Sequence, residues 1–457
     1  MTARRSPQRP SVSGDTWRTR LWPLPTAGVI TACLLGIGLP LVDANVIGAL
    51  PARVTAYLFS GGPQAARTVL SAIAGSLITV TSLTFSLTVV TLQLASSQYS
   101  PRLLRTFARD RFVHVTLALL LTTFTYALTV LRAVRASLED QSAFVPQLSV
   151  TVAYLLALVS VVALVVFLAH LARQIRVESL LDSVRTEAAQ TMRRCADDRT
   201  GTALAPAIPE TGTVPLCAVS SGFLTSVDEE ALLRAAVDTG TVVVLDRLPG
   251  DWVVVGTPIA VAWPLAGGTS GLDRQDVDAL SHHLAGAVRT GFERTSEQDI
   301  AFGLRQIVDV ATKALSPGIN DPTTALHALG HAAALLCEAA GEDLGPLLLH
   351  DGSGRVRTVV PRPGFPALLD LALSQPRRYG AAEPEVIGRL FMLLGEVAWS
   401  ARRSEHRAAI HDQLLRLRAT VDRQDYDHSE RARMEDLALA VQAALTGRWT
   451  YEASRRP

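Results

Sequence analysis

The chain opens with long apolar runs separated by short charged segments, and this pattern stops near residue 171. Four runs carry no charged residue, and each is long enough to cross a bilayer as a helix. They cover residues 24–42, 68–95, 112–131 and 148–171. The sequence therefore predicts a transmembrane domain of four helices over residues 24–171, followed by a cytoplasmic α+β domain.

The remainder divides by its residue pattern. Residues 1–23 form an arginine-rich cytoplasmic tail, and residues 172–213 a helical stalk with a linker rich in Pro, Thr and Gly. Short apolar runs between turn residues predict a small β-rich module over 214–265. Amphipathic patterns predict a helical cytoplasmic domain over 266–450.

The second apolar run contains the stretch GSLITVTSLTFSLTVVTLQLASSQYS, which is unusually rich in hydroxyl groups. Steps of three and four residues place small and polar groups on one stripe of a helix. A second stripe is expected beside the first, and apolar residues fill the remaining face. The first stripe comprises Gly75, Thr79, Ser82, Ser86 and Gln93, and the second includes Thr84, Thr88 and Thr91.

These stripes allow two interpretations. They can line a water-filled pore together with threonines of the third run. Alternatively, the hydroxyls bond to carbonyls of their own helix and let neighbouring helices pack closely. Close packing is favoured over pore lining.

Arginines set the expected orientation. They gather in the N-terminal tail, in the loop between runs two and three, and after run four, which places both termini in the cytoplasm and the spans in the plasma membrane. Gln98, Arg102 and Arg105 would then form a basic mouth on the cytoplasmic side.

Composition argues against several classes of function. A net charge of +1 gives no reason to expect nucleic acid. The four cysteines form no close pair and no zinc-type spacing, so neither a metal nor another cofactor is expected. No nucleophile elbow, phosphate loop, dinucleotide fingerprint or carboxylate pair is present, so we do not expect an enzyme.

Two motifs stand out in the soluble part. Thr295 to Gln298 fits a capping box that opens a helix running to about Leu315. The loop from Ser316 to Pro322 contains a Pro-Gly turn, and Asp321 is placed to cap the next helix. Asn320 and Asp321 could instead hold a cation, or the helix start an anion, but a structural corner is favoured.

Two long segments resemble a bacterial family of membrane proteins catalogued as domain of unknown function 2254. They are SLTFSLTVVTLQLASSQYSPRLLRTFARD and RTSEQDIAFGLRQIVDVATKALSPGINDPTTA. The resemblance covers most of the chain and implies an inner-membrane protein with a cytoplasmic domain, but no activity. The positions that match the family are Gln98, Ser100, Pro101, Arg102, Arg105, Gln298, Asp299, Gly303, Ser316, Pro317, Gly318, Asn320, Asp321 and Pro322.

Two functions remain open. In the first, a homo-oligomer in the bilayer forms a channel lined by the hydroxyl stripes of runs two and three, with the cytoplasmic domain as a gating or assembly collar. In the second, the chain is a membrane-anchored scaffold or sensor whose cytoplasmic helices bind a partner or small ligand.

Overall fold

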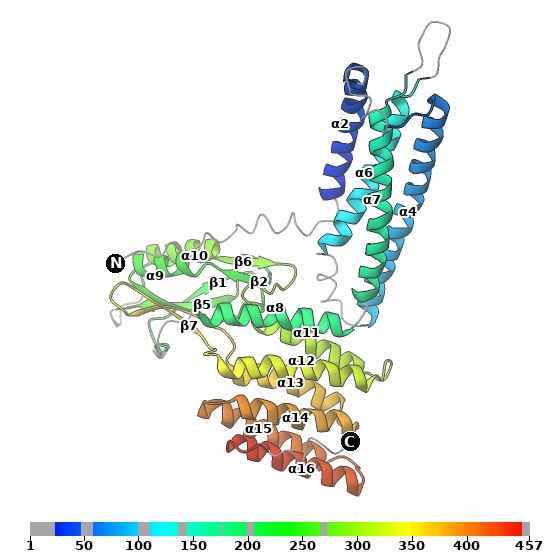
Figure 1. Ribbon diagram of the computed structural model, residues 1–457. Coiled ribbons are helices and arrows are strands. Elements are labelled where there is room, and N and C mark those ends of the chain that lie inside the picture. Colours follow the sequence, from blue (N-terminus) through cyan, green and yellow to red (C-terminus); the bar gives the residue numbers. More distant parts are fainter. Residues whose placement is uncertain are drawn as a thin grey trace. The chain divides into compact units, whose positions relative to one another are not determined.

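The computed structural model describes residues 23–46, 58–98, 110–135, 144–174, 177–197, 205–265 and 272–449. The chain forms two compact units, residues 1–176 and 177–457, and each is described by itself (Figure 1).

Four long apolar helices build the first unit, which confirms the prediction of four candidate membrane-spanning helices. Helix α6 lies at its centre and packs against all three others. In its apolar window 56% of the residues are buried, against 17–33% in the other three helices. The four helices are α2 (Pro23–Val46), α4 (Pro63–Gln98), α6 (Arg111–Ala133) and α7 (Gln147–Gln174).

Small residues let α2 and α6 approach closely. A Cβ added to Gly28 would lie 2.3 Å from the Thr122 hydroxyl, and one added to Gly36 would lie 2.7 Å from the Thr129 Cβ. Because glycine has no side chain there, the threonine side chains of α6 pack directly against the backbone of α2, as small residues allow in other membrane helix pairs.

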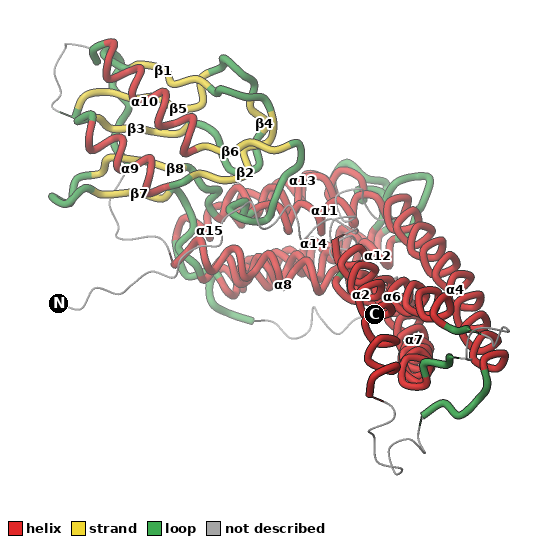
Figure 2. Tube along the Cα trace, turned by 90° about the horizontal axis from the view of Figure 1, so that it is seen from above, coloured by secondary structure: helices red, strands yellow, loops and turns green. Residues whose placement is uncertain are grey.

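The second unit contains a mixed five-stranded sheet in the order β1-β5-β3-β8-β7 and an antiparallel sheet in the order β4-β2-β6. Strands β3 and β8 are parallel, and the other pairs are antiparallel. Helices α9 (Glu229–Asp238) and α10 (Arg274–Ala287) cover one face of the larger sheet (Figure 2). The strands are β1 (Val214–Cys217), β2 (Gly222–Val227), β3 (Thr241–Leu245), β4 (Trp252–Val253), β5 (Pro258–Pro264), β6 (Val288–Gly291), β7 (Leu347–His350) and β8 (Val356–Val360).

The sequence pattern predicted strands only within residues 214–265, but the two sheets also include strands from outside this range. Strands β6, β7 and β8 come from the region expected to be helical. Arg357 of β8 is buried, and its guanidinium donates to the carbonyls of Thr241 (2.8 Å) and Ala236 (2.6 Å). These bonds tie β8 to β3 and α9, so the sheet needs both parts of the chain.

The remaining helices stack in successive layers (Figure 1). Helix α8 packs on α11 and α12, which in turn contact α13 and α14, and these contact α15 and α16. The apolar stripe of α8, which includes Leu181, Val184, Ala188 and Met192, is buried in this packing. The helices are α8 (Val177–Asp197), α11 (Ala301–Ala314), α12 (Pro322–Gly341), α13 (Phe365–Tyr379), α14 (Pro384–Ser400), α15 (Ser404–Val421) and α16 (His428–Leu445).

Candidate functional site

The two stripes of α4 lie on opposite faces of the helix, not side by side as expected from the sequence. At about 100° per residue, positions 75 and 84 are separated by half a turn. Thr81, Thr84 and Thr91 are buried together with Leu70 and Leu77, which makes their stripe the packing face of α4 within unit 1.

Hydroxyls on the packing face bond to their own helix. Thr81 Oγ1 donates to the Leu77 carbonyl (2.7 Å), Thr88 Oγ1 to that of Thr84 (2.8 Å), and Thr91 Oγ1 to that of Leu87 (2.9 Å). These bonds satisfy the hydroxyls without a partner from another helix and allow close packing. For this stripe the structure favours packing over pore lining.

The other stripe points away from the unit. Gly75, Thr79, Ser82, Ser86 and Gln93 are all exposed. Apolar side chains flank the stripe on both sides, and they too are exposed: Ile78 and Phe85 on one side, Leu83 and Val90 on the other. Among the residues that the structure describes, contacts within the single chain therefore leave this small and polar surface uncovered.

The threonines of α6 contribute to packing inside the unit. Thr123 Oγ1 lies 3.0 Å from Ser160 Oγ of α7, and Thr116 is buried. Thr122 and Thr129 face the glycines of α2. The central position of α6 turns these threonines toward neighbours in the same chain. That spans two and three jointly line a pore stays a prediction. The basic surface expected at the cytoplasmic end of the pore consists of Gln98, Arg102 and Arg105. The side chain of Gln98 and both arginines lie outside the described residues.

Unit 1 contains a buried carboxylate that the sequence pattern does not predict. The first apolar run ends at Val42, but α2 continues to Val46 and includes Asp43, which is 2% exposed. Asp43 Oδ1 accepts from the Leu148 N–H, and Oδ2 accepts from the N–H and hydroxyl of Ser149. A carboxylate on the first N–H groups of a helix satisfies donors that have no partner inside that helix. Asp43 thus caps α7 from α2.

In unit 2, Gln298 and Asp299 join α11 to the smaller sheet. The Gln298 side chain accepts from the Val227 N–H (2.8 Å) and donates to the Val227 carbonyl (3.0 Å). The expected capping box is therefore absent, and α11 begins at Ala301 instead of near Thr295. Gln298 cannot cap the helix because its amide extends the pairing of β2.

Asp299 is buried beside Arg294, whose guanidinium donates to Asp299 Oδ2 and lies over the Phe302 ring. Asp299 Oδ1 accepts from the Ala301 N–H at the start of α11 (3.1 Å). Burial raises the pKa of the Asp299 carboxyl, and Arg294 opposes this shift. Gly250 has φ +97°, and a Cβ there would lie 2.1 Å from Asp299 Oδ2. The ion pair of Arg294 and Asp299 is mostly buried, and it connects the start of α11 with the turn at Gly250. We refer to Gln298 and Asp299 together as the joint.

The loop between α11 and α12 forms the predicted corner. Asp321 caps α12 by accepting from the Thr324 N–H (3.1 Å) and hydroxyl (2.6 Å), and Pro322 occupies the first turn. These two bonds lower the pKa of the Asp321 carboxyl. Asn320 takes a left-handed conformation (φ 49°), and the Ser316 hydroxyl donates to the Lys313 carbonyl. These hydrogen bonds make the loop a structural corner between α11 and α12.

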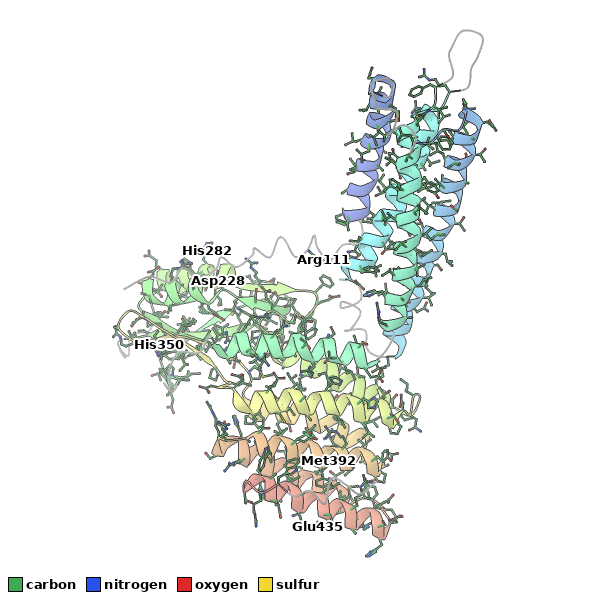
Figure 3. The ribbon with its side chains drawn as sticks, in the orientation of Figure 1. Arg111, Asp228, His282, His350, Met392 and Glu435 are labelled. Atoms are coloured by element: carbon green, nitrogen blue, oxygen red, sulfur yellow. The ribbon has the colours of Figure 1, made fainter. Side chains whose placement is uncertain are left out.

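The histidines of the described residues do not gather into a metal centre. His327 Nδ1 lies 3.6 Å from a carboxylate oxygen of Glu178. His282, which is labelled in Figure 3, and the next residue, His283, are exposed on α10. Within the described residues, no group of three or more His, Cys, Asp or Glu side chains could hold a metal ion.

Comparison with known proteins agrees with the resemblance seen in the two motifs. The model of a family described as "Predicted membrane protein (DUF2254)" matches residues 18–396. Uncharacterized proteins of Mycobacterium bovis and Mycobacterium tuberculosis are each 35% identical over 427 residues, which is 92% of this chain and 79% of the relative. No solved structure matches the chain.

Proposed function

Because the chain belongs to this family of membrane proteins of unknown function, we propose that unit 1 is inserted in the bacterial plasma membrane with both termini in the cytoplasm. Four helices with mean hydropathies of 1.7 to 2.9 in their apolar windows support insertion. The concentration of arginines before α2, between α4 and α6 and after α7 supports the orientation.

Within that membrane, the chain assembles into a homo-oligomer that conducts a small solute or ion. The observation that carries this proposal is the uncovered stripe of α4. An amide such as Gln93 is costly to expose to hydrocarbon, and a stripe of Gly, Ser and Thr favours contact with another helix or with water. Facing copies of α4 would place the stripe along a common axis, while Leu83, Phe85 and their neighbours would face lipid or adjacent helices.

Unit 2 serves this assembly as a gating or collar domain and not as an enzyme. Helix α8 follows α7 after two residues and packs on α11 and α12. Within unit 2, a displacement of α8 would reach the layered helices through α11 and α12, and the contacts of the joint at Gln298 and Asp299 would carry it to the smaller sheet.

A second candidate function is supported by a different surface. In and next to the smaller sheet, Trp252, Val255 and Phe292 are 54%, 56% and 83% exposed. Phe223 of β2 pairs with Trp252 on one side and with Gly291, the residue before Phe292, on the other. Large exposed apolar side chains in one part of a fold are typical of protein interaction sites and favour a membrane-anchored scaffold or sensor.

Flux measurements separate the two. The full chain is reconstituted in liposomes, and the flux of small anions and cations is compared for the wild type and a Ser82→Leu, Ser86→Leu double variant. Conduction along α4 predicts that the wild type passes at least one ion and that the variant reduces this flux to the rate of empty liposomes, because two leucines fill the stripe.

The matched control is Leu83→Val with Val90→Leu, which alters two apolar side chains beside the stripe and keeps their character. This control should retain both flux and oligomer size. If a fully assembled wild type passes no ion at any voltage tested, or if the double variant conducts as well as the control, the conduit is excluded. If the wild type passes no ion, loss of partner binding in a Trp252→Ser, Phe292→Ser variant of unchanged oligomer size would support the scaffold.

A further inference from the structure

A groove of about 860 Å³ lies between the end of α2 and the end of α6. Its volume is within the usual range for small-molecule sites. Gly36 marks the point where the two helices touch, and beyond it α2 presents only Pro40 and Ala44 alongside the exposed side chains of Ile37 and Leu41. Small residues on α2 therefore leave a space that larger ones would fill.

The groove combines an apolar wall with two positive charges. Arg132 and Arg135 line it from the α6 side, and both are exposed. The structure gives neither guanidinium a carboxylate partner among the described residues. The Asp43 carboxylate is buried, accepts its hydrogen bonds from the start of α7 and does not line the groove.

The segment that carries Arg135 is held in place before any ligand binds. The backbone of Arg135 pairs with that of Phe144, with N···O distances of 3.0 and 3.1 Å in the two directions, and Phe144 also lines the groove. Arg67 of α4 donates to the Val134 carbonyl (3.1 Å). Fixed positions for the charged groups reduce the entropy lost on binding.

We propose that this groove binds an acidic phospholipid, with its phosphate on Arg132 and Arg135 and one acyl chain along Ile37 and Leu41. The charge selects an anionic headgroup over a zwitterionic one, and the length of apolar wall selects a lipid over a free phosphate. The proposal rests on insertion of unit 1 in a bilayer but not on conduction, so failure of the flux experiment leaves it standing.

Native mass spectrometry of the full chain in nonionic detergent tests the proposal with dioleoyl phosphatidylglycerol and dioleoyl phosphatidylcholine as probes. The wild type should bind phosphatidylglycerol more tightly, by about fivefold for each arginine. Arg132→Gln with Arg135→Gln should lower that affinity to the level of phosphatidylcholine. Ala44→Trp, which fills the groove and keeps both charges, should weaken binding as well.

The matched control is Arg111→Gln with Arg173→Gln, which removes two exposed arginines from the opposite ends of α6 and α7; Arg111 is labelled in Figure 3. This variant should keep the preference. Equal binding of the two lipids by the wild type, or equal losses in the test and control variants, would overturn the proposal. Full displacement by glycerol phosphate would show a headgroup site without an acyl chain and would equally overturn it.

Discussion

At the scale of single residues, His406 is a buried histidine with a predictable effect on stability. It is 3% exposed, and its ring lies 4.3 Å from that of Phe365, centroid to centroid. Burial lowers the pKa of His406 below its ordinary value of 6.5, and the positive charge of Arg403 adds to this. The unfolded chain therefore takes up a proton at a higher pH than the folded chain does. The contribution of His406 to the free energy of unfolding is therefore fully present above about pH 6.5. It is lost as the pH falls below 6.5 toward the lower pKa of the folded state.

Hydrogen exchange of the full chain in detergent checks this prediction. After correction for intrinsic rates, amides of α13 and α15 should lose protection between pH 7.5 and 5.5, and His406→Gln should lose less. His411→Gln alters an exposed histidine of the same helix and should behave as the wild type does. Equal pH dependence in all three proteins would contradict the assignment to His406.

The capping role of Asp43 could not be predicted from the sequence. A rule that excludes charges from apolar spans stops the first helix at Val42, and Asp43 then counts as part of a loop. Its partners, Leu148 and Ser149, lie more than a hundred positions away. Sequence gives no signal for a cap supplied by another helix. Asp321 was predictable because a cap within three residues leaves a local pattern, with Pro322 beside it.

At the scale of elements, the contact between α8 and α11 depends on Gly303. A Cβ at this position would lie 2.4 Å from the Ala188 Cβ and 3.3 Å from the Ala188 Cα. Because the second of these neighbours is backbone, a rotamer change cannot relieve the clash. Gly303→Ala should cost about 1–3 kcal/mol of stability despite the better helix propensity of alanine.

Chemical unfolding of the full chain, followed by tryptophan fluorescence, measures this cost. Gly330→Ala is the matched control, since a Cβ there meets nothing closer than 3.9 Å within a helix of the same unit. It should be neutral or stabilise by up to about 1 kcal/mol. Adding Ala188→Gly to Gly303→Ala should recover part of the loss. If the two single glycine variants unfold alike, close packing at Gly303 is not important.

The elements themselves were predictable to different degrees. Length and hydropathy alone identified the four apolar helices, because a helix that crosses a bilayer needs a long apolar run. Strands β7 and β8 were missed because each has only four or five residues and β8 finds its partner β3 more than a hundred positions away. Helical spacing grouped the residues of each α4 stripe. Which stripe is buried depends on the side of α4 that packs against α6 and α7, and spacing alone does not show this side.

At the scale of the whole molecule, the exposed stripe of α4 predicts how copies of the chain associate. If the stripe is the contact between copies, a cysteine on it meets its counterpart, whereas a cysteine on the packing face does not. The test uses Ser82→Cys, Leu83→Cys and Thr84→Cys in full chains whose four native cysteines are replaced by alanine. These three neighbouring positions occupy the stripe, the apolar flank and the packing face.

Oxidation in membranes should give disulfide dimers from Ser82→Cys, few from Leu83→Cys and fewest from Thr84→Cys, which is buried within its own chain. A disulfide requires Cα atoms within about 7 Å, so efficient cross-linking at position 82 means close approach of two α4 helices. Leu83 is 69% exposed, so it reports on random collisions between copies in the bilayer. Equal cross-linking at 82 and 83 would mean that collisions dominate and that the stripe of α4 meets lipid or a different partner. A clear preference for 82 would show that the stripe of α4 is the contact between copies of the chain, whereas conduction itself is decided by the flux measurement.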